Sequence, residues 1–270
     1  MRVQVKRLAS QITILIAANL GAFKIKTGFC YPFLYCQACP AADAACPLRA
    51  FEQSVFQKSF TWKLLIYPLA SLGAIGITTG RAICGWGCPI GFLQRGTSKV
   101  ARKVKTRSFA QRLGSTKFEK YFRYNKYAML VVFVFLTSML IGFIFTDVCP
   151  IGVLVGTLPI LFLNPGQFVP NYFFPIAMVI FALFLIMIFT VERGWCRYFC
   201  PVGALLGPMN KVSMLHMDVK TDGCTHCNLC SRSCPMGIDV PNMHRDPECI
   251  LCGKCVDACP NKFIQYKVKS

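Results

Sequence analysis

Long apolar stretches alternate with shorter polar stretches along this sequence. A helix needs about 20 mainly apolar residues to cross about 30 Å of hydrocarbon, and several segments come near that length. They are Leu8–Phe23, Trp62–Thr79, Tyr127–Phe145 and Tyr172–Val191. Aromatic residues near several of their ends are typical of membrane interfaces. The pattern predicts an all-α integral membrane bundle of four transmembrane helices.

Basic residues are unevenly distributed between these segments. The stretch 80–126 holds twelve Lys or Arg residues and Glu119 as its only acid, whereas the stretch 146–171 holds no Lys or Arg. Cytoplasmic loops are enriched in Lys and Arg, so we expect 80–126 and both termini in the cytoplasm, with 24–61 and 146–171 outside. The protein would then be a multi-pass protein of the inner (cytoplasmic) membrane. The basic loop would contact membrane lipid or dock an acidic redox protein, and nothing in the chain supports nucleic-acid binding.

Composition agrees with the membrane prediction and adds an unusual cysteine content. Hydrophobic residues make up 54% of the 270 positions and charged residues 15%, while the formal net charge is +19. This is too apolar and too poor in charge for an ordinary soluble domain. Seventeen cysteines far exceed normal usage. A chain of this length does not need a disulfide scaffold, so the cysteine spacings point to metal chemistry.

The most specific motif lies after the last apolar segment. Two runs follow the spacing C-x2-C-x2-C-x3-C-P, which is typical of bacterial two-cluster ferredoxins, in which the fourth cysteine of each run binds the other cluster. We therefore predict one [4Fe-4S] site at Cys224, Cys227, Cys230 and Cys259, and a second at Cys249, Cys252, Cys255 and Cys234. Paired C-x2-C motifs also suit zinc, but two complete runs that end in Cys-Pro favour iron–sulfur clusters.

A second cysteine motif occurs twice, at RAICGWGCPIGFL and RGWCRYFCPVGAL. Each copy follows an apolar segment, and together they supply Cys84, Cys88, Cys196 and Cys200. A permanent disulfide is not expected on the cytoplasmic side, where thiols stay reduced. The alternatives are a third cluster shared between the two copies, a zinc or copper site, or buried free thiols in a tight turn. The repeat thus predicts two halves of one redox site at the inner surface.

The expected outer loops also contain cysteines. These are Cys30, Cys36, Cys39, Cys46 and, in the later loop, Cys149. Cys-Pro steps in this group echo those of the cluster motifs, which favours a further cluster held by four of the five. Two disulfides with one cysteine left over, or a redox-active thiol pair, remain open alternatives.

Few other residues indicate chemistry. The only histidines, His216, His226 and His244, all follow the last apolar segment, so no pair of membrane histidines can hold a haem. Quinone binding is open from the sequence. Asp147 and Glu192 are candidate proton-handling acids near membrane depth, although each also fits an interface role, with Glu192 pairing with Arg193.

The cysteine motifs, in combination with the apolar segments, resemble those of the NapH-type membrane polyferredoxins, with kinship to the membrane portions of NosR and CcoG. The resemblance covers about Trp62 to the end of the chain. It implies an iron–sulfur electron-transfer subunit of a respiratory oxidoreductase complex, with other subunits and a ferredoxin-like or quinone redox partner. It also implies transfer between a cytoplasmic or membrane donor and the quinone pool or an extracytoplasmic acceptor. The CcoG kinship suggests an alternative, a copper or iron reduction or maturation factor.

These expectations define three parts of the chain. Residues 1–192 would form the transmembrane domain, and 193–215 would contain the second repeat and a linker. Residues 216–270 would form a small α+β ferredoxin-like domain with two [4Fe-4S] clusters. The inner and outer cysteines would hold one or two further clusters.

Overall fold

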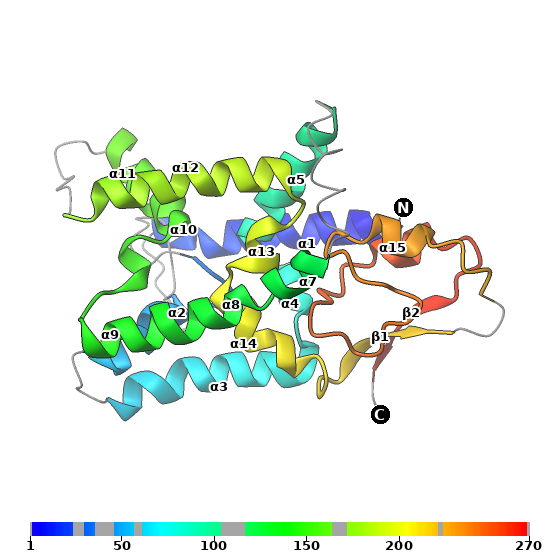
Figure 1. Cartoon of the computed structure of the whole chain (residues 1–270), viewed down its shortest axis with the longest axis horizontal. Helices are drawn as coiled ribbons and strands as arrows, with labels where there is room; N and C mark the ends of the chain where they lie inside the picture. The colour runs from blue at the N-terminus through cyan, green and yellow to red at the C-terminus, as the bar shows by residue number, and fades with distance from the viewer. Residues whose placement is uncertain are drawn as a thin grey trace.

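The long helices lie side by side and form one end of the molecule in the computed structural model (Figure 1). The structure describes residues 2–23, 30–35, 46–56, 61–103, 117–163, 172–220 and 224–268. The long helices are α1 (Arg2–Ala18), α3 (Trp62–Thr79), α12 (Phe174–Thr190) and a continuous helix from Asn125 to Leu140. The last is built from α8 (Asn125–Ala128), the π-helical η3 (Met129–Leu136) and α9 (Thr137–Leu140).

One of the described helices, α3, is long and apolar enough to cross a membrane by itself. Shorter apolar helices cover Asn125–Leu140, Pro150–Phe162 and Phe174–Thr190. The third helix ends five residues before the predicted Phe145, and α1 begins six residues before the predicted Leu8. Four complete spans therefore remain a prediction.

The stretches expected to connect the transmembrane helices contain helices of their own. The predicted outer stretch 24–61 contains α2 (Pro47–Ser54), and the predicted stretch 80–126 contains α4 (Ala82–Trp86), α5 (Pro89–Lys103) and α7 (Lys117–Phe122). The stretch 146–171 contains α10 (Pro150–Gly152), η5 (Val153–Thr157) and α11 (Leu158–Leu163), after the short η4 (Phe145–Asp147). Several of these helices begin with a proline directly after a cysteine, and proline suits the first helical position because its fixed φ is already helical.

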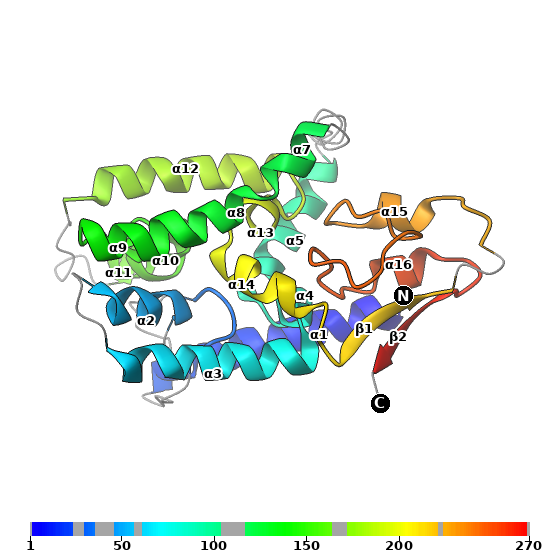
Figure 2. The ribbon, with the colours of Figure 1, turned by 60° about the horizontal axis from the view of Figure 1, so that its bottom comes forward.

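The C-terminal part forms a small α+β unit at the other end of the molecule. Two short helices, α13 (Gly194–Tyr198) and α14 (Pro201–Met209), lead from α12 toward it. Strands β1 (Leu215–Val219) and β2 (Ile264–Val268) pair antiparallel, with Leu215 opposite Val268. Helices α15 (Leu229–Ser233) and α16 (Lys254–Ala258) lie between them in sequence. Both chain termini lie at this end of the molecule (Figure 2).

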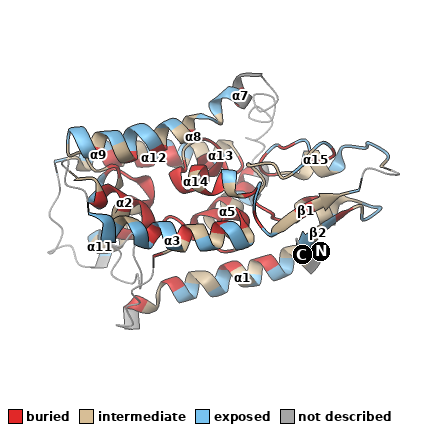
Figure 3. Cartoon of the chain, turned by 90° about the horizontal axis from the view of Figure 1, so that it is seen from below, coloured by how far each residue is buried: buried red, intermediate tan, exposed pale blue. Residues whose placement is uncertain are grey.

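Burial differs between the short helices near the cysteine motifs and the long helices (Figure 3). Buried residues concentrate where the short helices α4, α5, α13 and α14 meet. The long helices instead expose large apolar side chains such as Leu69, Leu140 and Leu183, which are 50%, 60% and 61% exposed. Continuous exposed apolar surface of this kind is characteristic of contact with lipid or with another protein.

Candidate iron–sulfur centres

The ferredoxin-like unit brings its eight cysteines together in two groups of four. Cys234, Cys249, Cys252 and Cys255 line one small cavity, and Cys224, Cys227, Cys230 and Cys259 line another. Each group thus contains three cysteines from one run and the fourth cysteine of the other run. We call them the proximal and the distal group, because the first lies against the helical part, as described below.

The two runs wrap their cavities with the same backbone conformation. Positive φ angles occur on either side of the second cysteine of each run, at His226 and Asn228 in one and at Leu251 and Gly253 in the other. Non-glycine residues rarely adopt this left-handed conformation. Loops of this kind turn successive backbone N–H groups toward an anion and are common at iron–sulfur sites. Both loops are therefore suited to an anionic cluster.

The proximal group is more enclosed than the distal group. Cys252 and Cys255 are buried, whereas Cys227 is exposed. Burial raises the pKa of the Cys249 thiol to about 12 and also raises the pKa of Cys255. A metal that binds such thiols must displace their protons, because the thiolate is the ligand.

The duplicated motif brings Cys84, Cys88, Cys196 and Cys200 into one buried group, which we call the inner site. Burial, followed by the neighbouring Cys196 and Cys84, raises the pKa of Cys88 to about 12. The pKa of Cys200 rises for the same reasons. Both copies use the same local structure: Cys88 precedes α5 and Cys200 caps α14, where the N–H of Gly203 lies 3.4 Å from the Cys200 sulfur.

The arginine of each motif copy donates a hydrogen bond to the other copy at the inner site. Arg81 of the first copy donates to the carbonyl of Cys196 at 2.8 Å, and Arg193 of the second donates to the carbonyl of Cys84 at 3.0 Å. A Cβ on Gly203 would lie 2.8 Å from the Arg81 guanidinium, and one on Gly91 would lie 2.3 Å from that of Arg193. The glycine of each Cys-Pro-x-Gly therefore makes room for the arginine of the other copy. These reciprocal contacts account for the positions of arginine and glycine in the repeated sequence.

Several polar atoms around the inner site have no hydrogen-bond partner. They are Nε of Arg81, one terminal nitrogen of Arg193, and Oε1 of Gln94, all of them buried. The amide nitrogen of Gln94 lies 3.3 Å from the Cys196 sulfur. Two buried guanidinium groups beside four thiols suit an anionic cluster, since its sulfurs accept hydrogen bonds that tune its potential.

The proximal loop is bonded directly to the first motif copy. The Trp86 indole N–H donates to the Leu251 carbonyl at 2.8 Å. A Cβ on Gly85 would lie only 2.2 Å from the carbonyl oxygen of Ile250, so backbone meets backbone here. Helix α1 holds both sides, because Arg7 donates to the Gly85 carbonyl at 2.7 Å and Gln4 to the Cys252 carbonyl at 3.0 Å. The segments that carry the inner site and the proximal group are thus in direct contact in space.

Asn210 and two acids reinforce this junction. Asn210 accepts from the Arg81 backbone N–H at 2.7 Å and donates to the Cys249 carbonyl at 2.7 Å. Glu248 accepts from Arg81 at 2.9 Å. Glu192 pairs with Lys254 of α16 at 2.5 Å, and its expected pairing with Arg193 stays a prediction. Sequence reasoning missed Asn210 and Glu248 because their partners are distant in the chain.

The outer cysteines are only partly described. Cys30, Cys46 and Cys149 are buried, whereas Cys36 and Cys39 lie outside the described residues. Cys46 precedes Pro47 at the start of α2, and Cys149 precedes Pro150 at the start of α10. The sequence analysis missed that CPIGVL at Cys149 is a third copy of the Cys-Pro-x-Gly-x-Leu pattern, a signal visible in the sequence.

A buried acid links α2 to the short η4 that precedes α10. Glu52 of α2 is fully buried and accepts from the Thr146 hydroxyl at 2.6 Å and from its backbone N–H at 3.2 Å. Burial raises the pKa of Glu52 to about 7. Arg49, from the same helix, pairs with Asp147 at 3.0 Å, so Asp147 has a structural partner.

Comparison with known proteins agrees with these sites. A family model described as "4Fe-4S binding domain" matches residues 60–107 and 173–219, which contain the two motif copies, and a "4Fe-4S dicluster domain" model matches residues 208–269. No solved structure shows a significant match to the chain.

Similar curated proteins come from bacteria and an archaeon. An uncharacterized protein of Methanocaldococcus jannaschii, MJ0750, is 29% identical over 75% of this chain and 78% of its own length. The ferredoxin-type protein NapH of Escherichia coli is 29% identical over 71% of this chain and 65% of its own. The putative electron transport protein YccM of the same bacterium is 24% identical over 71% of this chain and 52% of its own. The chain is thus similar to the NapH-type polyferredoxins and carries a C-terminal 4Fe-4S module.

Proposed function

We propose that this protein is a membrane-bound electron-transfer subunit in which electrons pass between the ferredoxin-like unit and the inner site. The distal and proximal groups each hold one [4Fe-4S] cluster, and the inner cysteines hold a third. Such a cluster supplies one-electron chemistry. The single observation that carries this proposal is the bonded junction between the proximal loop and the first motif copy.

The order of the sites follows from their exposure and contacts. Cys227 of the distal group faces solvent, and an exposed cluster edge suits exchange with a ferredoxin-like partner. The proximal loop contacts the first motif copy where Ile250 meets Gly85, which supports an order in which the proximal group connects the distal group with the inner site. This order gives a path from the cytoplasmic side to the membrane, if the basic stretch 80–126 is cytoplasmic as the positive-inside rule predicts.

The membrane location rests on the apolar surface of the long helices. Exposed Leu69, Leu140 and Leu183 would face lipid in a multi-pass protein of the cytoplasmic membrane. Beyond the inner site, electrons would pass to or from the quinone pool, or through the outer cysteines to an extracytoplasmic acceptor. The third Cys-Pro-x-Gly copy at Cys149 supports an outer redox site. No observation favours the metal-maturation alternative.

Proteoliposomes test this proposal. The complete protein is reconstituted anaerobically with either a short-chain quinone in the bilayer or ferricyanide enclosed as an impermeant acceptor, and reduced ferredoxin is added outside. We expect reduction of at least one acceptor, and its loss in the double variant Cys84→Ser, Cys196→Ser with both ferredoxin-type EPR signals retained. Rates equal to those of empty vesicles with both acceptors would contradict the proposal.

A further inference from the structure

Two buried arginines lack the acidic partner that other buried cations of this protein have. Arg81 and Lys126, for example, share the carboxylate of Glu248. Buried charges are ordinarily paired in this way, because an isolated charge is costly to remove from water. Arg7 and Arg193 are only 1% and 2% exposed, yet within the described ranges of the chain neither forms an ion pair with an acid.

Neutral groups hold both guanidiniums at the same turn of α4. Arg193 donates to the Cys84 carbonyl at 3.0 Å, and Arg7 donates to the carbonyl of the next residue at 2.7 Å. A glutamine side chain holds Arg95, which adds a third positive charge. Burial, followed by the charge of Arg193, lowers the pKa of Arg95. The three arginines therefore repel one another at a place where like charges are poorly solvated.

Cysteines of both adjoining sites lie beside these arginines. One terminal nitrogen of Arg193 lies 4.0 Å from the Cys196 sulfur, and the other is buried and has no hydrogen-bond partner. Arg7 lies toward the proximal group, because Gln4 accepts from Arg7 at 3.2 Å and donates to the Cys252 carbonyl at 3.0 Å. Cysteines bind a cluster as thiolates. Bound clusters would thus bring negative charge to the arginines from two sides.

The backbone at Arg193 also indicates a role for its side chain. Its φ angle is 60°, in the left-handed region that residues other than glycine rarely adopt. Residues held in such conformations cluster at functional sites. Glycine at this position would relieve the backbone strain but would remove the guanidinium from the inner site.

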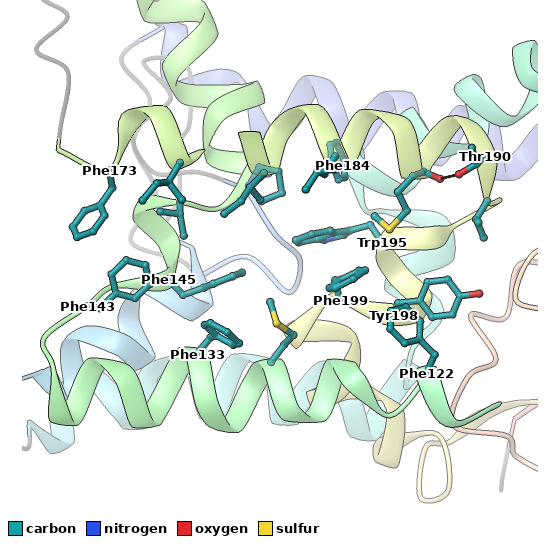
Figure 4. A pocket seen from close by; sticks show the side chains of 18 of the residues that line it. Phe122, Phe133, Phe143, Phe145, Phe173, Phe184, Thr190, Trp195, Tyr198 and Phe199 are labelled. Atoms are coloured by element: carbon teal, nitrogen blue, oxygen red, sulfur yellow. Dashed lines mark hydrogen bonds between the residues drawn. The ribbon is translucent and has the colours of Figure 1, made fainter. Parts of the chain in front are cut away.

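An apolar wall borders the inner site as well. Trp195 and Phe199, which directly precede Cys196 and Cys200, line a large cavity between α12 and the continuous helix 125–140 (Figure 4). Most of the side chains around this cavity are aromatic or aliphatic. Charges interact more strongly in such surroundings, because little water is present to screen them. A buried positive charge beside the inner site should therefore affect its reduction potential strongly.

We propose that Arg7 and Arg193 stabilise the reduced state of the inner site by supplying the positive charge that balances its additional electron. Reduction adds one electron, and hence one negative charge, to a cluster there, and the proximal cluster that donates the electron is oxidised. No proton has to move, because arginine stays protonated. Nearby positive charge raises the reduction potential, so electrons collect at the inner site rather than at the distal group. This inference rests on the proposed function, which places a cluster at the inner cysteines.

An EPR-monitored redox titration of the reconstituted holoprotein tests the inference, because each cluster is followed by its own signal. In the wild type, the inner midpoint potential should lie above the distal one. Arg193→Met removes the charge, and we expect the equilibrium of the inner cluster to shift about tenfold toward the oxidised state, a fall of about 59 mV in its midpoint potential. Arg193→Lys keeps the charge and should restore most of the wild-type value. The distal midpoint should stay the same in both variants.

A second arginine variant and a charge control complete the test. Arg7→Met should also lower the inner midpoint, and it decides the matter if Arg193→Met does not assemble the inner cluster. Gln11 still donates to the Gly85 carbonyl in that variant. Lys99→Met is the matched control, because it removes one positive charge from an exposed position of α5, where water and salt screen it.

Three results would overturn the inference. They are an inner midpoint below the distal one in the wild type, shifts in the arginine variants no larger than that of Lys99→Met, and shifts that occur only in vesicles containing an anionic lipid. The last would mean that a lipid phosphate neutralises the arginines. Any of these results with iron present at the inner site would leave the proposed function intact, whereas a wild type without inner-site iron would remove both.

Discussion

Replacing Gly85 by alanine would disturb the junction between the inner site and the proximal group. The added Cβ would lie 2.2 Å from the Ile250 carbonyl oxygen, whereas real Cβ contacts stay above 3.0 Å. The proximal loop would therefore have to move by at least 0.8 Å (3.0 − 2.2). Overpacking of this kind costs about 1–3 kcal/mol. Arg7 and Gln11, which both donate to the Gly85 carbonyl, would be displaced as well.

The assay combines stability with electron transfer. We expect Gly85→Ala to lower the thermal unfolding midpoint of the reconstituted holoprotein and to slow reduction of the inner site, followed by freeze-quench EPR after mixing with reduced ferredoxin. Gly96→Ala is the matched control, because a Cβ on Gly96 would meet no atom within 4 Å. Equal midpoints and equal rates in the two variants would refute the reasoning that this contact couples the two sites.

Three further changes test other parts of the structure. Asn210→Ala removes the bonds to Arg81 and Cys249 and should cost about 2–3 kcal/mol of unfolding free energy; a loss below about 0.5 kcal/mol would count against this role. Folding raises the pKa of Glu52 from 4.5 to about 7. Between these two pH values the folded state binds more protons than the unfolded state, so the free energy of unfolding falls as the pH rises through this range. Glu52→Gln should remove this dependence and stabilise the protein at pH 8 by at most about 3 kcal/mol in chemical denaturation, and an unchanged pH profile would argue against it. Because Cys227 is exposed, limited exposure to air should bleach the distal EPR signal before the proximal one, and simultaneous loss would contradict the difference in burial.

The ferredoxin-like unit was the easiest part to predict from the sequence. Its cysteines are close in sequence, and their spacing alone places Cys234 and Cys259 in opposite groups. The inner site could be predicted only as a set of cysteines. The roles of Arg81 and Gly203 depend on a contact between segments more than 100 residues apart, and no local pattern reveals which arginine crosses to which copy.

The helices inside expected loops were missed for a different reason. The stretch 146–171 was expected to connect the third and fourth apolar segments, and the helices in Pro150–Leu163 were not predicted, although its residues are apolar and follow a Cys-Pro start. Arg7 and Gln11 likewise interrupt or border the first apolar segment, and the structure shows that they bind the first motif copy rather than water. Glu52 gave no signal, because an isolated acid in a short helix is ordinarily exposed.

Iron and acid-labile sulfide per chain, measured on anaerobically purified protein together with EPR of the reduced sample, test the central claim most directly. Clusters at the distal, proximal and inner sites predict about twelve irons per chain, and an outer cluster would raise this to about sixteen. The double variant Cys84→Ser, Cys196→Ser should lose about four irons and keep both ferredoxin-type signals. About eight irons in the wild type, unchanged in that variant, would contradict a cluster at the inner site.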